Sequence, residues 1–166
     1  MTVNETTQKG SQRTTTKLRA QAEQAAQPEQ SAPDASAAQT LTPEIVLALH
    51  AASDKKALAP VVLDLRGIGG FTDYFLITSG TNQRQVQAIA DEVAERLKKA
   101  GTRAARIEGY KTAEWVLLDY GDFIVHVFDD KARRFYDLER LWRDAALVEL
   151  PPELRSDVSS SLHREA

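Results

Sequence analysis

The chain has 166 residues, enough for one domain of ordinary size with a tail at each end, and an apolar fraction of 42% that permits a folded core. Its net charge of −3 argues against a protein that grips nucleic acid chiefly through phosphates, and it suits a basic partner. The absence of cysteine excludes disulfides, thiolate metal sites and a thiol nucleophile. Because no membrane-spanning run or secretory signal is evident, we expect a soluble, cytoplasmic protein without a membrane partner.

Both ends of the chain differ in composition from its middle. Residues 1–40 are dominated by Thr, Gln, Ala, Ser and Pro and hold almost no large apolar side chain. Such a segment buries too little surface to offset its ordering entropy, so we predict a disordered N-terminal tail. Residues 151–166 open with two prolines and are predicted to be a loose C-terminal tail. This leaves residues 41–150 as the folded domain.

The first predicted elements are a helix and two strands. Thr42, Pro43 and Glu44 form a helix start, with a hydroxyl cap, a proline at the first position and an acid in the first turn. Residues 61–65 (VVLDL) then read as a strand. A flexible glycine-rich turn leads into a second strand over residues 73–78.

The strongest helix signal follows residues 79–82 (SGTN). Its apolar side chains keep helical spacing, and Lys98, Lys99 and Gly101 mark its end. A short third strand is expected over residues 104–109. The last predicted element is one helix with four apolar residues on a single stripe: Phe135, Leu138, Leu141 and Ala145.

Residues 115–120 and 123–128 are two strand-like runs joined by Gly121-Asp122, a two-residue hairpin signal in which glycine supplies the positive φ of a type II′ turn. The implied pairing sets Tyr120 opposite Phe123 on a wholly apolar face, followed by Leu118 with Val125 and Val116 with Val127. The other face mixes apolar groups with an acid and an imidazole: Trp115, Leu117, Asp119, Ile124, His126 and Phe128. A face of that kind is either covered by another element or kept for a partner.

This order of elements predicts an α/β fold, a mixed five-stranded sheet packed with helices. No strong catalytic motif accompanies it. Residues 79–82 precede a helix and could hold phosphate, but no P-loop lysine follows, so a cap and turn is favoured. Asp64 and Asp73 lack the acid-x-acid spacing of a metal pair and are favoured as strand-end and turn residues. We therefore expect no catalytic residue, metal or cofactor.

His126 and the aromatic residues around it leave alternatives open. Asp119 is the diagonal neighbour of His126 across the hairpin, and a structural histidine held by this aspartate is favoured over an acid–base dyad, with a contact surface as a third reading. Four aromatic residues surround the hairpin and the last helix: Trp115, Phe128, Tyr136 and Trp142. Tyr136 and Trp142 lie beside the apolar stripe, so at least one of them is expected to reach a surface.

Three segments resemble the ribosomal silencing factors, the Iojap-related family. They are residues 73–81 (DYFLITSGT), 108–128 (EGYKTAEWVLLDYGDFIVHVF) and 134–142 (RFYDLERLW), within a similar region of roughly residues 42–148. The resemblance implies a domain related in shape to nucleotidyltransferases but without their catalytic acids. It also implies a non-enzymatic factor that binds the large ribosomal subunit at ribosomal protein uL14, blocks joining of the small subunit and represses translation under nutrient limitation. Homodimers off the ribosome are implied as well, and no sequence-specific nucleic acid contact is expected.

Carried onto this chain, the motif positions expected to contact the ribosomal protein are Trp115, Leu117, Asp119, Tyr120, Asp122, His126, Tyr136 and Trp142. The departures from the family pattern are the long N-terminal tail and residues 57–60 (ALAP), where the family usually carries more acidic residues. The alternative is a nucleotide-binding enzyme of nucleotidyltransferase shape, with Ser79 and Gly80 near phosphate and Asp64 or Asp73 on magnesium.

Overall fold

The computed structural model of the chain describes residues 40–155. The tail predicted over residues 1–40 therefore lies almost wholly outside the described residues, and so does the second predicted tail from residue 156 onward. Residues 152–154 form a short 3₁₀ turn, η1 (Pro152–Leu154), and Leu154 is buried in the core. The packed chain thus continues beyond the expected boundary at residue 150.

The domain is built on a six-stranded sheet with the order β3-β4-β5-β2-β1-β6. β2 and β5 pair in parallel, whereas the other neighbours are antiparallel, so the sheet is mixed as predicted. The strands are β1 (Leu58–Asp64), β2 (Tyr74–Gly80), β3 (Arg106–Glu108), β4 (Trp115–Asp119), β5 (Phe123–Asp129) and β6 (Ala146–Leu147). The prediction of five strands was wrong by one, because β6 is only two residues long and exists by pairing with Leu63 and Asp64 of β1.

The hairpin of β4 and β5 has the predicted register. Leu118 pairs with Val125 and Val116 with Val127, while the Tyr120 N–H donates to the Phe123 carbonyl at 3.0 Å. Gly121 has φ +85° at the first turn position, as a type II′ turn requires. The inward side chains of both strands are fully buried, so this face belongs to the core.

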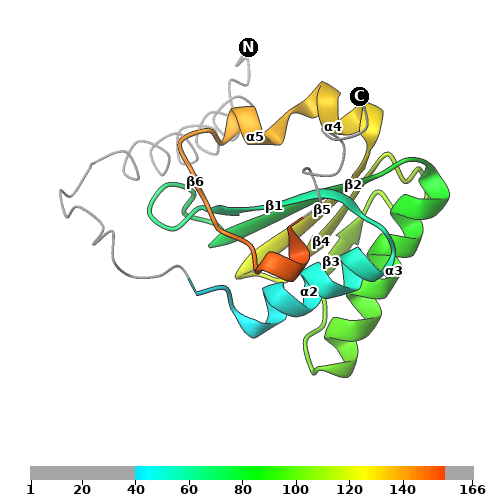
Figure 1. The fold of residues 1–166 in the computed structure, drawn as a ribbon, viewed down its shortest axis with the longest axis horizontal. Coiled ribbons are helices and arrows are strands. Elements are labelled where there is room, and N and C mark those ends of the chain that lie inside the picture. The colour runs from blue at the N-terminus through cyan, green and yellow to red at the C-terminus, as the bar shows by residue number, and fades with distance from the viewer. Residues whose placement is uncertain (1–39, 156–166) are drawn as a thin grey trace, which may run out of the picture. The chain divides into compact units, whose positions relative to one another are not determined.

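Helices α2 (Pro43–Asp54) and α3 (Gln83–Lys99) cover that face together, on the opposite side of the sheet from the later helices (Figure 1). Thr42 caps α2 by accepting the Ile45 N–H at 3.4 Å, and Asn82 caps α3 by accepting the Gln85 N–H at 2.9 Å. The predicted apolar stripe of α3 is buried from Val86 to Leu97. These helices, the hairpin and β1 form one contiguous core.

The single helix predicted near the C-terminus is two short helices, α4 (Asp130–Tyr136) and α5 (Leu138–Leu141). Asp137 separates them in a left-handed conformation with φ +45°. The break destroys the expected stripe, because Phe135 and Leu141 are 79% and 72% exposed while Leu138 is buried. Helical spacing predicts a common face only when the helix is continuous.

Candidate functional site

The sheet face opposite α2 and α3 is buried at its centre and exposed toward one edge. On β5, His126 and Phe128 are 3% and 0% exposed, because α4 packs on this strand and on β2. On β4 the side chains of this face are half-buried, and on β3 they are exposed. We call the uncovered part the open face; it consists of Trp115, Leu117, Asp119, Arg106 and Glu108, which share one side by register.

The loop before β4 positions Trp115 at the border between the open face and α4. Gly109 has φ +77°, and a Cβ there would collide with the Trp115 carbonyl oxygen, so the chain turns back tightly against the start of β4. The Trp115 ring then stacks on Phe128 with centroids 5.0 Å apart and meets Tyr136 of α4 at 4.8 Å. Tyr136 is 47% exposed, which confirms that one of the two aromatic residues beside the stripe reaches the surface.

A second group of rings extends from this border toward β1. Trp142 is half-buried and packs on Phe75 of β2 with centroids 5.6 Å apart. It also meets Phe71 at 5.8 Å, and Phe71 is 56% exposed. Phe75 also contacts the imidazole of His126, with centroids 4.5 Å apart. Trp115 and Trp142 therefore belong to one aromatic layer, in which Trp115 contacts His126 directly and Trp142 is connected to it through Phe75.

His126 is not held by Asp119, so both the aspartate-held histidine and the acid–base dyad are wrong. Its Nδ1 accepts a hydrogen bond from the Trp115 indole Nε1–H at 3.0 Å, and its Nε2 is buried with no partner. Burial lowers the pKa of His126 from 6.5 to about 4, because no neighbouring group compensates for the desolvated charge. The diagonal pairing failed as a prediction because the larger indole of Trp115 reaches the imidazole from the same strand pair.

Asp119 instead organises the end of the hairpin and the charge of the open face. Its Oδ1 accepts the Gly121 N–H at 2.9 Å, and its Oδ2 lies 3.6 Å from the Arg106 guanidinium. Arg106 also lies 3.2 Å from Glu108, so one cation sits between two carboxylates. The polar rim of the open face therefore carries a net charge of −1, which suits a basic partner surface.

Tyr120 and Asp122 lie away from the open face. Tyr120 stacks on Phe123 at 4.8 Å and packs against the core under α2 and α3. Its hydroxyl is buried without a partner, and burial raises the pKa of Tyr120 to about 12. Asp122 is exposed in the turn, where its carbonyl accepts the Asp73 N–H at 2.9 Å. Tyr120 and Asp122 are thus separated from the other predicted contact residues, which the structure groups together: Trp115, Leu117, Asp119, His126, Tyr136 and, through Phe75, Trp142.

Sequence reasoning missed the outer surface of α4 and α5. Phe135 and Leu141, which were expected on one stripe with Leu138, line a shallow hollow together with Arg134, Arg140 and Arg143. Phe135 meets Tyr136 edge to face at 5.1 Å, so this apolar surface continues into the aromatic layer. The one local signal is Asp137 itself, because aspartate tolerates the left-handed conformation and often precedes a helix, but the helical spacing on both sides outweighed it in the prediction.

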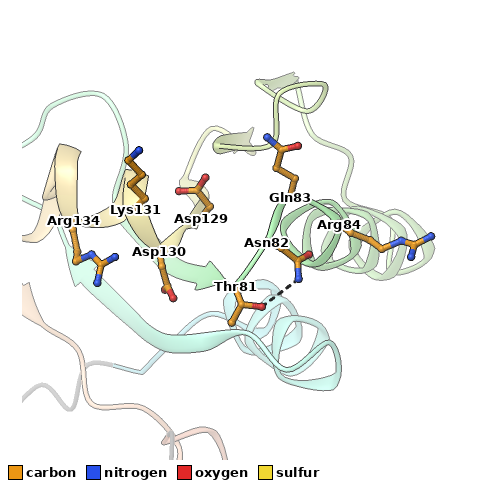
Figure 2. A pocket seen from close by; sticks show the side chains of 8 residues that line it. All are labelled: Thr81, Asn82, Gln83, Arg84, Asp129, Asp130, Lys131 and Arg134. Carbon is orange, nitrogen blue, oxygen red and sulfur yellow. Dashed lines mark hydrogen bonds between the residues drawn. The ribbon is translucent and has the colours of Figure 1, made fainter.

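The phosphate site considered at residues 79–82 is a turn with caps, as favoured. Figure 2 shows the hollow there, with residues 81–84 on one side and Asp129, Asp130, Lys131 and Arg134 on the other. The Thr81 N–H and hydroxyl both donate to the Gln85 side chain, and Asn82 caps α3. Ser79 is buried and accepts from Arg133 at 3.2 Å. Two carboxylates and three cationic side chains line the hollow, and the Asn82 side chain already accepts an N–H at the start of α3, so nothing in this arrangement singles out a phosphate.

Asp64, one of the two residues of the considered metal pair, is bound to an arginine. Arg66 donates to both oxygens of Asp64, with Nη2 at 2.8 Å from Oδ2. Burial of the Asp64 carboxyl opposes its ionisation, but the hydrogen bonds from Arg66 outweigh this and lower its pKa. Within residues 40–155 no group of three or more His, Cys, Asp and Glu side chains could hold a metal ion.

A family described as "Ribosomal silencing factor during starvation" matches residues 38–166 of the chain. The chain belongs to this family. Its members include regulators named for ribosomal silencing, so the chain is a ribosomal silencing factor by descent, and its role is classed with translation regulation. The sequence resemblance is thereby confirmed.

Relatives in several bacteria carry the name of the ribosomal silencing factors. The Halalkalibacterium halodurans factor is 48% identical over 104 residues, which cover 63% of this chain and 89% of the relative. The Bacillus subtilis factor is 44% identical over the same length and is covered to 88%. The chloroplastic protein Iojap of Zea mays is 35% identical over 101 residues, 61% of this chain and 44% of that protein.

Two solved structures share the fold of this silencing factor. A crystal structure from Bacillus halodurans is 45% identical with a TM-score of 0.58, covering 64% of this chain and 96% of that one. A protein from Chromobacterium violaceum is 33% identical with a TM-score of 0.59, covering 67% and 91%. The α/β fold class is confirmed by these likenesses. Within residues 40–155, the silencing factor has no helix long and apolar enough to cross a membrane.

Proposed function

We propose that this silencing factor binds the large ribosomal subunit at ribosomal protein uL14 and sterically blocks joining of the small subunit, repressing translation when nutrients are limiting. The observation that carries the proposal is the open face, where Trp115 and Leu117 are half-buried on a sheet surface that α4 leaves uncovered. Aromatic anchors with an apolar neighbour and a polar rim are the usual composition of a protein–protein contact.

The open face, Tyr136 and Trp142 form the proposed contact surface, with His126 beneath it. The acidic rim made by Asp119 and Glu108 around Arg106 would meet a basic ribosomal protein. The action is occlusion of a surface, so no reaction is required of the factor, and it acts without a cofactor. Off the ribosome the same apolar surface would be covered by a second copy in a homodimer.

Leu117 and Ile107 provide a matched test of this surface. Leu117 lies on the open face, whereas Ile107 of β3 is 48% exposed and pairs with Leu118, so it lies on the opposite face of the same sheet edge. Co-sedimentation of the purified factor with large subunits measures binding, and the joined-ribosome peak measures activity. We expect Leu117→Ala to weaken binding roughly tenfold and restore joining, with Ile107→Ala unchanged.

Two outcomes would contradict the proposal. The wild-type factor could stay at the top of the gradient while subunit joining is untouched, or Leu117→Ala could bind as tightly as the wild type. The alternative, a nucleotide-binding enzyme, is tested by the melting temperature with nucleotides and Mg²⁺. A ligand that binds only the folded state raises this temperature, so an increase would favour the enzyme.

A further inference from the structure

His126 and Trp115 are joined by a hydrogen bond that connects the buried aromatic layer to the open face. The indole Nε1–H of Trp115 donates to Nδ1 of His126 at 3.0 Å. His126 is 3% exposed, whereas Trp115 is half-buried at the edge of the uncovered surface. The bond therefore links His126, which no partner can reach, to Trp115, which a partner can contact.

The second imidazole nitrogen has no partner. Because Nδ1 accepts the indole N–H, the neutral ring must carry its proton on Nε2, and Nε2 is buried without an acceptor. A buried, unpaired N–H lowers stability, and an apolar side chain of similar shape would avoid that cost. Packing alone therefore does not explain an imidazole at this position, whereas an acceptor for Trp115 does.

We propose that His126 is a positioning residue, whose Nδ1 fixes the indole of Trp115 in the orientation that the ribosomal partner meets. This inference rests on the proposed function. It means that His126, although buried, pre-organises the contact surface. A side chain held in its bound orientation loses less entropy on association, so the rigid indole strengthens binding without any contact from His126 itself.

The surroundings of the two rings hold them in this arrangement. The imidazole meets Phe75 edge to face at 4.5 Å, with an interplanar angle of 78°. The indole stacks on Phe128 at 5.0 Å with an angle of 27°, and Tyr136 closes in at 4.8 Å. Ring contacts have broad energy minima and tolerate small changes in the side-chain torsions of Trp115, whereas the directional hydrogen bond to Nδ1 favours one orientation of the indole.

Leucine and asparagine at position 126 separate positioning from packing. Asparagine places its Oδ1 near the position of Nδ1 and accepts the indole N–H, whereas leucine has a similar shape and no acceptor. We expect His126→Leu to weaken large-subunit binding about two- to tenfold, the effect of one lost hydrogen bond, and His126→Asn to restore most of it. Equal binding by the wild type and His126→Leu would refute the proposal, as would equal losses in both variants.

A spectroscopic readout reports the indole directly, without ribosomes. The chain has two tryptophans, so a Trp142→Phe variant assigns the two indole N–H resonances in ¹⁵N-labelled full-length protein. We expect the Trp115 resonance to move upfield and broaden in His126→Leu and to stay near its wild-type position in His126→Asn. An unchanged resonance in His126→Leu would refute the ordering role even if binding falls.

Trp115→Phe tests the same bond from the other side and covers the case in which His126→Leu does not fold. Phenylalanine keeps the ring contact but has no N–H donor, so adding His126→Leu to it should cause no further loss of binding. Additive losses would overturn the proposal. If the wild-type factor does not bind the large subunit at all, the proposed function fails. In that case the Trp115 resonance should still respond to the substitutions at position 126, because this readout does not depend on ribosome binding.

Discussion

Arg133 holds Glu139 across the break at Asp137, with its Nε and Nη2 at 3.0 and 2.8 Å from the same carboxylate oxygen. The guanidinium also donates to the carbonyls of Leu58 and Ala59 at 3.2 and 2.8 Å. One side chain therefore ties α4 to α5 and both helices to the irregular start of β1. This tie fixes the α4 border of the contact surface, since Tyr136 ends the helix that Arg133 anchors.

Replacing Arg133 with methionine should release α4 and α5. The change keeps the length of the side chain but leaves two carbonyls and Glu139 without their donor, so we expect the free energy of unfolding to fall by roughly 1–3 kcal/mol. Urea unfolding measures this change. Arg134→Met is the matched control, because the Arg134 side chain has no hydrogen bond or ion pair within residues 40–155. Equal effects of the two variants would contradict the anchoring role.

Acid should destabilise the protein through His126. The pKa of His126 is about 4 in the folded protein and 6.5 in the unfolded chain. The unfolded chain therefore binds the proton first, and stability falls as the pH drops from 6.5 toward 4. We expect a loss of about 2 kcal/mol between pH 6.5 and 4.5 that His126→Asn does not show. Parallel pH profiles of the two proteins in urea unfolding would show that another group is responsible.

Alkali should destabilise the protein through Tyr120. Burial raises its pKa from 10.0 to about 12, so the unfolded chain loses the proton first and stability falls as the pH rises above 10. Tyr120→Phe should remove this alkaline loss. It should also raise stability at neutral pH by about 1 kcal/mol, because the deleted hydroxyl is buried and unpaired.

Tyr110→Phe is the control for Tyr120→Phe. The Tyr110 hydroxyl donates to Asp91 at 2.9 Å on the surface, so the same chemical change should lower stability slightly. Thermal unfolding at pH 7 compares the two variants. A destabilised Tyr120→Phe would mean that its hydroxyl has a partner in solution, such as a bound water.

Replacing Lys56 with glycine should stabilise the protein. Lys56 follows α2 with φ +61°, a left-handed conformation that disfavours side chains with a Cβ, and the Ala57 N–H closes the helix end on the Ala52 carbonyl at 3.0 Å. We expect Lys56→Gly to raise the melting temperature, because removing the Cβ should increase the free energy of unfolding by roughly 1 kcal/mol. Lys55→Gly, at φ −97°, should lower it. The opposite order would show that the lysine side chain itself stabilises the turn.

The local features of this protein were determined by its sequence. Gly121-Asp122 sets the hairpin turn, and the alternation on either side of it sets the pairing of Leu118 with Val125. The caps Thr42 and Asn82 start their helices as predicted. Each of these features depends on residues close together in the chain, where turn geometry, capping and periodicity act without the rest of the fold. The family motifs could be recognised for the same reason, as ordered local strings.

Only the tertiary structure decided which surface is open and what His126 contacts. The break at the left-handed residue Asp137 is bridged by Arg133, whose partners on β1 lie 75 and 74 residues earlier, and the break turns Phe135 and Leu141 outward. Likewise, β6 exists only because β1 presents a free edge to it. His126 is paired with Trp115 and not with Asp119 because burial under α4 favours the neutral indole donor over a charged carboxylate. These outcomes depend on packing between distant segments, which no local pattern encodes.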